Sequence, residues 1–459
     1  MVKGLFEEEI AALDGRDTFV LKGRVERVVG LTAQLADFPA AIGAVCRVET
    51  GQAAGVEGEI VGFRAQKALM MPYGDTLGLK AGDWVRCIGG GQSLPVSSEL
   101  LGRVIDGRGR PRDDKGPILG GKRMQAHRRP PDPLRRANIT EPLGTGVRAI
   151  DGLLTIGRGQ RIGIFSGAGV GKSVLMGMIA RFTDADVNVI ALIGERGREV
   201  REFIERDLGE EGVKRSVVVV ETGDGPALLR VKAALAATTI AEYFRDQGLD
   251  VMLMMDSVTR MAMALREIGL SAGEPPATKG YPPSVFATLP RVLERSGCDE
   301  GGSITGIYTV LVEADDMNEP IGDACRGILD GHIWLSRDLA VQNHYPAISA
   351  LDSISRLMMA VTDDEHKTAA GFIKSIMATY RQSEELINIG AYARGSNAQI
   401  DLAIDMIGDV RSFLQQGMMD RSSFAEARNT VVALAEKARS RGAEAKPRPG
   451  DARVRTGAL

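Results

Sequence analysis

Short apolar runs separated by glycine dominate the first hundred residues. The strand-length runs are FVLKGRVERVVGL, GAVCRVET, GVEGEIVGFRA, KALMMPYG and DWVRCIG. Strands of this length at close, regular spacing are typical of a small antiparallel barrel. The pattern therefore predicts a β-barrel domain over residues 18–95.

From residue 145 to residue 360, longer apolar runs alternate with helical stretches. The runs RIGIFS, NVIALIG, SVVVVET, VMLMMD and GIYTVLVE are apolar at nearly every position. Strands of a parallel sheet have this continuous pattern when helices cover both faces of the sheet. The sequence predicts an α/β domain over residues 145–360.

The remaining segments are helical, polar or rich in turn residues. Residues 1–17 place Phe6, Ile10 and Leu13 on one face of a short helix, which must dock on its own chain or on a partner to be stable. Residues 96–144 are rich in Gly, Pro and Arg and indicate a linker into the core. Residues 361–440 follow a helical pattern, and we expect the polar residues 441–459 to fray.

Composition narrows the class of protein. The 459 residues suggest two to four domains, and 44% hydrophobic with 25% charged residues is ordinary for a globular chain. A net charge of -3 gives no overall field that favours nucleic acid or an anionic membrane. The arginine-rich linker lacks the interleaved aromatic residues that stack on bases, so we expect no nucleic-acid partner.

Several other classes are excluded by particular residues. No uncharged apolar run approaches the roughly 18 residues that a membrane-spanning helix needs, and three consecutive glutamates interrupt the N-terminus where a signal peptide is apolar. Four widely spaced cysteines form no C-x-x-C pair, and the four histidines include no H-x-x-x-H pair. A zinc site and a disulfide framework are therefore not expected.

The strongest chemical signal is IGIFSGAGVGKSVLMGMIA, residues 162–180. An apolar strand runs into a glycine-rich turn and then into a helix, which is the pattern of a phosphate-binding loop. We expect Lys172 to contact the terminal phosphates and the Ser173 hydroxyl to ligate Mg²⁺. The standard pattern begins with glycine, where this chain has Ser166. The candidate nucleotide-binding residues of the loop are Gly167, Ala168, Gly169, Val170, Gly171, Lys172, Ser173 and Val174.

Two carboxylates are placed at the ends of apolar strands. Glu195 follows NVIALIG, and it could polarise a water for attack on the γ-phosphate, unless Arg196 and Arg198 neutralise it. Asp256 ends VMLMMD, where it could hold the Mg²⁺ ion or, alternatively, cap the following helix. Because parallel strands end at one edge of the sheet, we expect both carboxylates near the phosphate loop.

The segment NHYPAISALDSISRLMMA, residues 343–360, adds an aromatic ring and a cation. Tyr345 could stack on adenine, and Arg356 could stabilise the charge of the transition state. From their chemistry alone, a core tyrosine and a surface arginine are the more common situations.

Taken in order, these segments resemble the RecA-like rotary family, which includes ATP synthase catalytic subunits, vacuolar-type catalytic subunits and type III export ATPases. Further matching stretches are GRVERVVGL, LGRVIDGRGRP, GEPPATKGYPPSVFATLPRVLER, GSITGIYTVLVEADDMNEPI and NIGAYARGSNAQIDLAI. The resemblance spans about residues 20 to 440 and is closest to the flagellar export branch, with the injectisome branch as its neighbour. It implies a RecA-like P-loop ATPase core, an N-terminal β-barrel domain and a C-terminal helical domain.

The resemblance also assigns roles to single residues. It makes Glu195, Lys172 and Arg356 catalytic, with Arg356 reaching into a neighbouring subunit's site, and it gives Asp256 the Mg²⁺ side of the site. Tyr345 matches the adenine-stacking tyrosine, and Phe424 is a candidate for the second wall of the adenine pocket. The family signature usually has Asp, Asn or His where this chain has Ser349.

The assembly and partners follow from the resemblance alone. It implies ATP and Mg²⁺ as cofactors, a homohexamer, a stator-like regulatory protein on the N-terminal helix and a coiled-coil stalk protein in the pore. It also implies export-gate membrane proteins, export substrates and their chaperones. The expected location is cytoplasmic, at the inner face of the membrane beside the export apparatus.

Two other functions compete with protein export. A non-catalytic nucleotide-binding ring subunit would lack the glutamate found here at Glu195. An RNA-translocating ring would need an aromatic, basic N-terminal domain, whereas residues 18–95 are poor in aromatic residues and mixed in charge.

Overall fold

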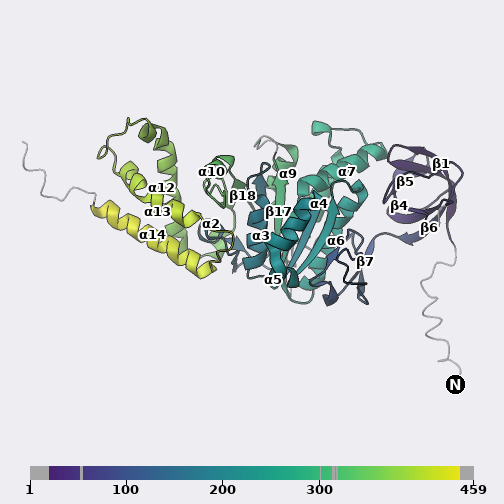
Figure 1. Ribbon diagram of the computed structural model, residues 1–459, viewed down its shortest axis with the longest axis horizontal. Coiled ribbons are helices and arrows are strands. Elements are labelled where there is room, and N and C mark those ends of the chain that lie inside the picture. Colours follow the sequence, from purple (N-terminus) through teal and green to yellow (C-terminus); the bar gives the residue numbers. More distant parts are fainter. Residues whose placement is uncertain (1–19, 52–54, 300, 313–315, 317–318, 445–459) are drawn as a thin grey trace, which may run out of the picture.

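The computed structural model describes residues 20–51, 55–299, 301–312, 316 and 319–444. Three parts lie in a row, with a barrel at one end, an α/β domain in the middle and a helical domain at the other end (Figure 1). The predicted N-terminal helix and most of the predicted tail lie outside the described residues. Within these ranges no helix is long and apolar enough to cross a membrane.

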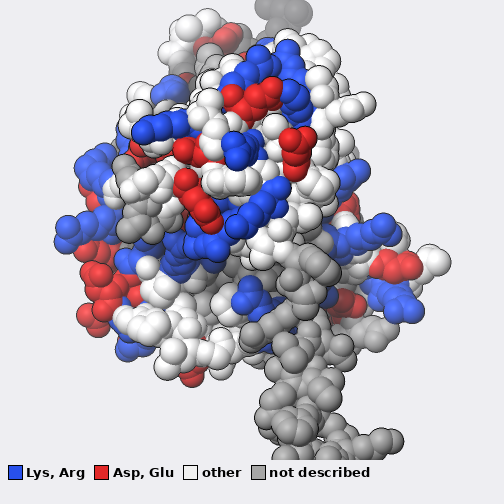
Figure 2. Space-filling model, turned by 90° about the vertical axis from the view of Figure 1, so that its right-hand side faces the viewer, with Lys and Arg blue, Asp and Glu red and all other residues white. Residues whose placement is uncertain are grey.

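Six antiparallel strands form the closed barrel, in the order β1-β2-β5-β4-β3-β6. Val25, Leu35, Ile60 and Met70 are among the side chains that fill its interior. The first predicted run contains β1, and the chain turns at its end at Gly30, which has a φ of 56°, before β2 begins at Thr32. Basic and acidic side chains are interspersed on the barrel end of the molecule (Figure 2). The strands are β1 (Lys22–Val29), β2 (Thr32–Ala36), β3 (Ala44–Glu49), β4 (Val56–Arg64), β5 (Lys67–Pro72) and β6 (Trp84–Gly90).

The connection between barrel and core has more structure than a linker. Strands β7 (Ser93–Val96) and β9 (Lys122–Gln125) pair with each other, and β10 (Pro142–Leu143) pairs with β11 (Ile156–Gly157). A 3-10 turn η1 (Ser98–Leu100) precedes strand β8 (Val104–Ile105), which joins the edge of the central sheet beside β14 (Ser216–Thr222). The short helix α2 (Arg148–Leu153) then leads into the core.

The core is a nine-stranded sheet with the order β19-β18-β12-β17-β15-β13-β14-β8, and β16 pairs with β17 off this path. The strands from β18 to β8 are parallel, whereas β16 and β19 are antiparallel. The apolar runs predicted as strands all lie in this sheet. The remaining strands are β12 (Arg161–Ser166), β13 (Val187–Glu195), β15 (Asp250–Asp256), β16 (Gly297–Cys298), β17 (Ser303–Leu311), β18 (Gly331–Leu335) and β19 (Ile354–Ser355).

Helices cover both faces of the sheet, which explains the continuous apolar strands. In β15, Met252 and Met254 face the cluster that includes α3, whereas Leu253 and Met255 face the cluster that includes α6 and α7. The helices of the core are α3 (Lys172–Phe182), α4 (Gly197–Glu202), α5 (Gly209–Lys214), α6 (Ala227–Arg245), α7 (Val258–Ala272), α8 (Pro283–Leu293), α9 (Pro320–Ile328), α10 (Arg337–Val341) and α11 (Met358–Val361), with the π-helix η2 (Phe203–Leu208) and the 3-10 turn η3 (Thr278–Gly280).

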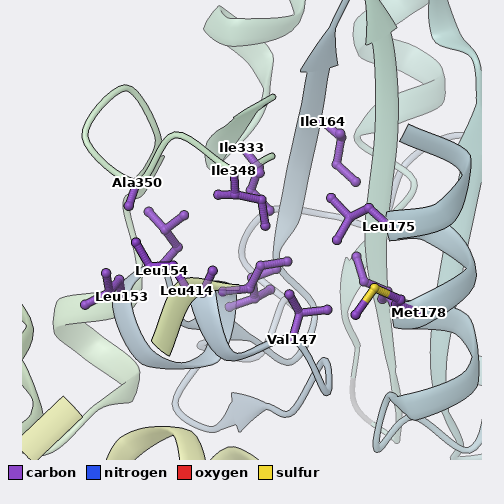
Figure 3. Packing of buried hydrophobic residues seen from close by; sticks show 14 of the residues in the cluster. Val147, Leu153, Leu154, Ile164, Leu175, Met178, Ile333, Ile348, Ala350 and Leu414 are labelled. Atoms are coloured by element: carbon purple, nitrogen blue, oxygen red, sulfur yellow. The ribbon is translucent and has the colours of Figure 1, made fainter. Parts of the chain in front are cut away.

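The helical domain consists of α12 (Asp364–Asn388), α13 (Ala398–Leu414) and α14 (Phe424–Glu444). It packs on α2, and its core is continuous with one face of the sheet. Figure 3 shows Leu414, from the end of α13, near Ile348 and beside Leu153, the last residue of α2, and Leu154, which follows it. The predicted fold class, an α/β core between a β-barrel and a helical domain, is confirmed.

Candidate active site

Strand register brings the candidate residues to one edge of the sheet. Leu192 of β13 pairs with Asp256 at the end of β15, and Ser166 at the end of β12 pairs with Leu311 of β17. The phosphate loop, Glu195 and Asp256 therefore all follow the carboxyl ends of neighbouring parallel strands. Ligands of open α/β sheets bind at this edge.

The phosphate loop wraps the start of α3. Gly169 and Gly171 have φ values of 78° and 94°, a conformation that glycine adopts without strain, and Gly171 is the residue that precedes the helix. A side chain at Gly169 would meet nothing within 4 Å, so the loop faces open space. Val170 is buried, and Val174 packs on the core, so they anchor the loop. The first turn of α3, with Lys172 and Ser173, directs unpaired N–H groups towards this space.

Ser166 occupies the position where the loop leaves the sheet. The residue is fully buried, and its carbonyl oxygen accepts a hydrogen bond of 3.0 Å from the Val312 N–H. Its hydroxyl has no hydrogen-bond partner among the described residues. The serine that replaces glycine at this position is therefore buried inside the sheet, and its side chain does not enter the phosphate loop.

Lys172 lies between the two strand-end carboxylates. Its Nζ contacts Asp256 Oδ1 and is 3.3 Å from Glu195 Oε1. Burial lowers the pKa of Lys172, but the charges of Asp256 and Glu195 outweigh this effect, so the net shift of its pKa is upwards. The lysine is therefore held in its charged form.

Glu195 has the environment of a general base. Burial raises the pKa of Glu195, the nearby charge of Asp256 raises it further, and Lys172 opposes both. Arg196 and Arg198, the alternative partners for this carboxylate, form ion pairs at 3.1 Å and 2.5 Å with Glu199 and Glu202. The side chain thus stays beside Lys172 and lines a small pocket between β13 and α4.

Asp256 accepts hydrogen bonds and does not cap the helix that follows it. Ser257 caps α7 by accepting a hydrogen bond of 3.2 Å from the Arg260 N–H. Thr309, on the neighbouring strand β17, donates a hydrogen bond of 2.6 Å to Asp256 Oδ1. Asp256 and Ser173 line the same pocket, and a carboxylate with a hydroxyl is an oxygen donor set that suits Mg²⁺.

Sequence reasoning missed two residues of the site. Thr309 orients Asp256 from another strand, and a threonine within an apolar run gives no signal of that contact. Arg260 packs its stem within 3.2 Å of the position that a side chain on Gly194 would occupy, next to Glu195. Its buried Nε has no hydrogen-bond partner among the described residues. Its position four residues after Asp256, on the first turn of α7, is the only hint that the sequence offered.

Tyr345 lies beside the phosphate loop. Its ring is within 3.5 Å of the position that a side chain on Gly171 would occupy, and the residue is 42% exposed. Its carbonyl oxygen accepts a hydrogen bond of 2.9 Å from the Gln416 N–H. The ring is therefore available to a planar ligand next to the loop.

Phe424 begins α14, and its ring centroid is 5.9 Å from that of His366 on α12. Its Cβ also lies 3.5 Å from the position that a side chain on Gly144 would occupy. These contacts belong to the packing between the core and the helical domain, and the role of Phe424 in an adenine pocket stays a prediction.

Arg356 is not brought together with the other candidates. It follows β19, its N–H donates to the Asp330 carbonyl at 3.0 Å, and its exposed guanidinium donates to the Arg326 carbonyl at 3.2 Å. The Asp330 N–H in turn bonds the carbonyl of Arg161, the first residue of β12, whereas the phosphate loop follows the last residue of that strand. Six residues of strand span about 20 Å, so Arg356 lies too far away to reach the site of its own chain.

Comparison with known proteins agrees with this architecture. The nucleotide-binding domain of the ATP synthase alpha/beta family matches residues 146–355, and the β-barrel domain of the same family matches residues 25–89. The C-terminal domain of the type III secretion ATPase EscN matches residues 362–433.

Individual relatives match over nearly the whole chain. The flagellum-specific ATP synthase of Bacillus subtilis is 52% identical over 93% of this chain and 98% of its own length. The type 3 secretion system ATPase of Xanthomonas euvesicatoria is 49% identical over 91% of this chain and 94% of its own length. A solved structure of assembled EscN with its central stalk EscO, from enteropathogenic E. coli, has a TM-score of 0.84 and 45% identity, covering 90% of this chain and 100% of EscN. The chain therefore belongs to the ATP synthase alpha/beta family, in the branch of the flagellum-specific ATP synthases and type 3 secretion ATPases.

Proposed function

We propose that this ATPase works as a homohexameric ring that hydrolyses ATP with Mg²⁺ and so energises or regulates the export of flagellar proteins through the type III secretion apparatus. The observation that carries the proposal is the group formed by Lys172, Glu195 and Asp256 at the carboxyl edge of the sheet, directly beside the phosphate loop. A phosphate-binding cation, a candidate base and a candidate metal ligand converge on one point.

Each residue has a role that follows from its position. The N–H groups at the start of α3, together with Lys172, bind and orient the terminal phosphates. Ser173 and Asp256 would hold Mg²⁺, which supplies charge neutralisation on the phosphates when bound. Glu195, whose pKa is raised by burial, orients the attacking water and accepts its proton. Tyr345 offers its exposed ring to the base of the nucleotide.

The present pairing of Lys172 indicates how the site responds to nucleotide. When ATP binds, its phosphate oxygens would compete with Glu195 and Asp256 for the Lys172 ammonium group, and Asp256 would then be free to hold Mg²⁺ together with Ser173. Binding of MgATP therefore exchanges one set of ion pairs for another and frees the carboxylate of Glu195 for a water. The site is complete only when both the metal and the phosphates arrive.

The position of Arg356 supports a site shared between neighbouring copies. Since the residue is exposed and about 20 Å of strand separates it from the phosphate loop of its own chain, it can act on phosphate only in an adjacent copy. A ring of six copies provides six such contacts. EscN, which is similar over its whole length, is described as assembled and in complex with its central stalk.

The partners and location are proposed on the same basis. We expect a coiled-coil stalk protein in the pore, a stator-like regulatory protein on residues 1–17, and contacts with export-gate membrane proteins, export substrates and chaperones. The ring would work in the cytoplasm at the inner face of the membrane. An injectisome ATPase is the alternative within the same branch. Restoration of motility in a flagellar-ATPase deletion strain would favour the flagellar function.

The enzymatic proposal is tested on the purified full chain. ATP hydrolysis should require Mg²⁺ and cease when the metal is chelated. The change Glu195→Gln should retain binding of a fluorescent ATP analogue and lose turnover by about 10²–10⁴-fold, because a general base contributes that much. Glu202→Gln, on the exposed face of α4, is the matched control and should leave turnover unchanged. Wild-type turnover in Glu195→Gln would refute the assignment.

The two competing functions make different predictions for the same preparation. A non-catalytic ring subunit would bind ATP without hydrolysing it. An RNA-translocating ring would be stimulated by single-stranded RNA. On the described part of the barrel end, however, acidic side chains lie among the basic ones, which weakens attraction for a nucleic-acid backbone (Figure 2). We expect hydrolysis by the chain alone and no effect of RNA.

A further inference from the structure

Gln416, two residues after the end of α13, connects three distant parts of the chain. The residue is 6% exposed, and its backbone N–H donates a hydrogen bond of 2.9 Å to the carbonyl oxygen of Tyr345. Its neighbour Gln415 is exposed. A polar side chain this deeply buried at a domain junction must have its hydrogen bonds made within the protein.

Both N–H donors and the carbonyl oxygen of the Gln416 amide have hydrogen-bond partners. Nε2 donates to the carbonyl oxygens of Gly146 at 2.8 Å and of Asp420 at 2.7 Å. Oε1 accepts a hydrogen bond of 2.8 Å from the N–H of Arg148, which is the first residue of α2. The side chain thus satisfies a helix-start donor that lies 268 residues earlier in the sequence.

Gly146, whose carbonyl oxygen accepts one of these hydrogen bonds, lies in a rigid segment. Gly146 has a φ of 77°, and a side chain there would clash with Phe182, the last residue of the phosphate-loop helix α3. The Gly146 N–H donates to the buried carboxyl group of Asp151 at 3.0 Å. Gln416 is therefore fixed to a part of the core that packs on the far end of α3.

A closed circuit of contacts results. It runs from α3 through Gly146 to the side chain of Gln416, and from the backbone of Gln416 to Tyr345. The Tyr345 ring then returns to Gly171, immediately before the start of α3. The position of the ring relative to the phosphate loop depends on each link of this circuit.

We propose that Gln416 is a positioning residue for nucleotide binding, which holds the Tyr345 ring at the distance from the phosphate loop that a bound ATP requires. The proposal rests on the proposed function, because it takes the Tyr345 ring as the surface for adenine. Gln416 does not touch the nucleotide, and it acts through the backbone of Tyr345. It also makes the affinity for ATP depend on the end of α13, and hence on the seating of the helical domain.

The test compares Gln416→Met with the matched control Gln415→Met in the full chain. Met has nearly the length of Gln but forms none of the three side-chain hydrogen bonds. Loss of an anchor worth one hydrogen bond should raise KM for ATP about three- to tenfold, while kcat changes less than about twofold. Gln415→Met should change neither constant. A second variant, Gln416→Glu, keeps the acceptor for Arg148 and loses both donors, so its KM should also rise.

A double variant separates positioning from a general loss of structure. Tyr345→Ala alone should raise KM, and adding Gln416→Met to it should raise KM by less than about twofold more, because the two changes remove the same interaction. A full additional increase would show that Gln416 acts by another route and would overturn the proposal. An unchanged KM in Gln416→Met, or a loss confined to kcat, would overturn it too.

These outcomes are distinct from failure of the proposed function. Absence of any ATP hydrolysis by the wild-type chain would contradict the enzyme assignment. An unchanged KM in Tyr345→Ala would contradict the role of the ring. A raised KM in Tyr345→Ala with an unchanged KM in Gln416→Met would leave both intact and reject only the positioning role of Gln416.

Discussion

Removal of Arg295 should destabilise the core strongly, because this side chain makes a buried ion pair at the junction between core and connection. Arg295 is 1% exposed and follows α8. Its guanidinium donates to both carboxylate oxygens of Glu242 on α6, at 2.7 Å and 2.9 Å. It also donates to the carbonyl of Ala126, in the segment from the barrel, at 2.7 Å and to the Thr239 hydroxyl at 3.0 Å.

The magnitude follows from what Arg295→Met leaves behind. Glu242 keeps a 2% exposed side chain, and among the described residues only Arg128, at 3.1 Å and itself 38% exposed, remains as its cationic partner. Breaking a buried pair costs about 3–5 kcal/mol, and the remaining contact with Arg128 favours the lower value. For a domain of this size, about 3 kcal/mol corresponds to a fall in Tm of about 6–12 °C. Replacing both partners, in Arg295→Met with Glu242→Met, should recover most of this loss, because no unpaired charge is left.

The two tryptophans of the chain make the assay specific. Trp334 is 8% exposed in the core strand β18, and Trp84 is 46% exposed in the barrel. In a Trp84→Phe background, fluorescence reports unfolding of the core alone. Arg291→Met, at an exposed position of α8, is the control and should change Tm by less than about 2 °C. A similarly small shift for Arg295→Met, or a double variant as unstable as the single one, would refute the reasoning.

Two further predictions concern assembly and pH. Arg356→Ala should lower turnover by about 10³-fold or more and abolish its rise with protein concentration, since the cation acts in a neighbouring copy; unchanged kinetics across a dilution series would count against a shared site. Burial raises the pKa of Asp151 to about 7 in spite of its hydrogen bonds from Thr145 and Gly146. Because this folded-state pKa lies above the unfolded value, its contribution to stability is present below pH ~4 and is lost as the pH rises through about 7. The Tm of Asp151→Asn should therefore improve relative to wild type as the pH rises from ~4 to ~7, and the difference should level off above that. Parallel Tm curves for the two proteins across this range would contradict the prediction.

The sequence predicted the parts of the fold that depend on local pattern. A strand buried on both faces, such as VMLMMD, is apolar at almost every position, and this pattern is visible in the sequence. Glycines at the turns marked where the strands of the barrel end. The sequence did not predict β18, a five-residue strand whose partner β12 lies about 170 residues away. It also did not predict β8, a strand of two residues that is defined by its pairing with β14. Pairing between distant segments leaves no periodic signal in so short a run.

The candidate active site also combines residues that a local pattern predicts with residues that only distant packing brings together. Lys172 and Ser173 were predicted from spacing, because a phosphate loop is a continuous piece of chain. Tyr345 and Arg356 are 11 positions apart, yet one lies beside the loop and the other at the opposite end of β12. The contacts of Thr309 with Asp256, and of Gln416 with Arg148, are set by packing between remote segments. No local pattern could have revealed them.

The two residues of β8 have a consequence for how the chain avoids aggregation. The valine-rich strand β14 would otherwise end the parallel sheet with unpaired N–H and C=O groups, an edge on which strands of other molecules can assemble. β8 covers that edge at Val218 and Val219, and a bridge from Ile105 to Pro111 turns the chain back immediately beside it. Because β8 precedes β14 in the chain, β8 has already been synthesised and can pair with β14 as soon as β14 leaves the ribosome. Shortening the connection would thus threaten the solubility of newly made protein before it affected catalysis.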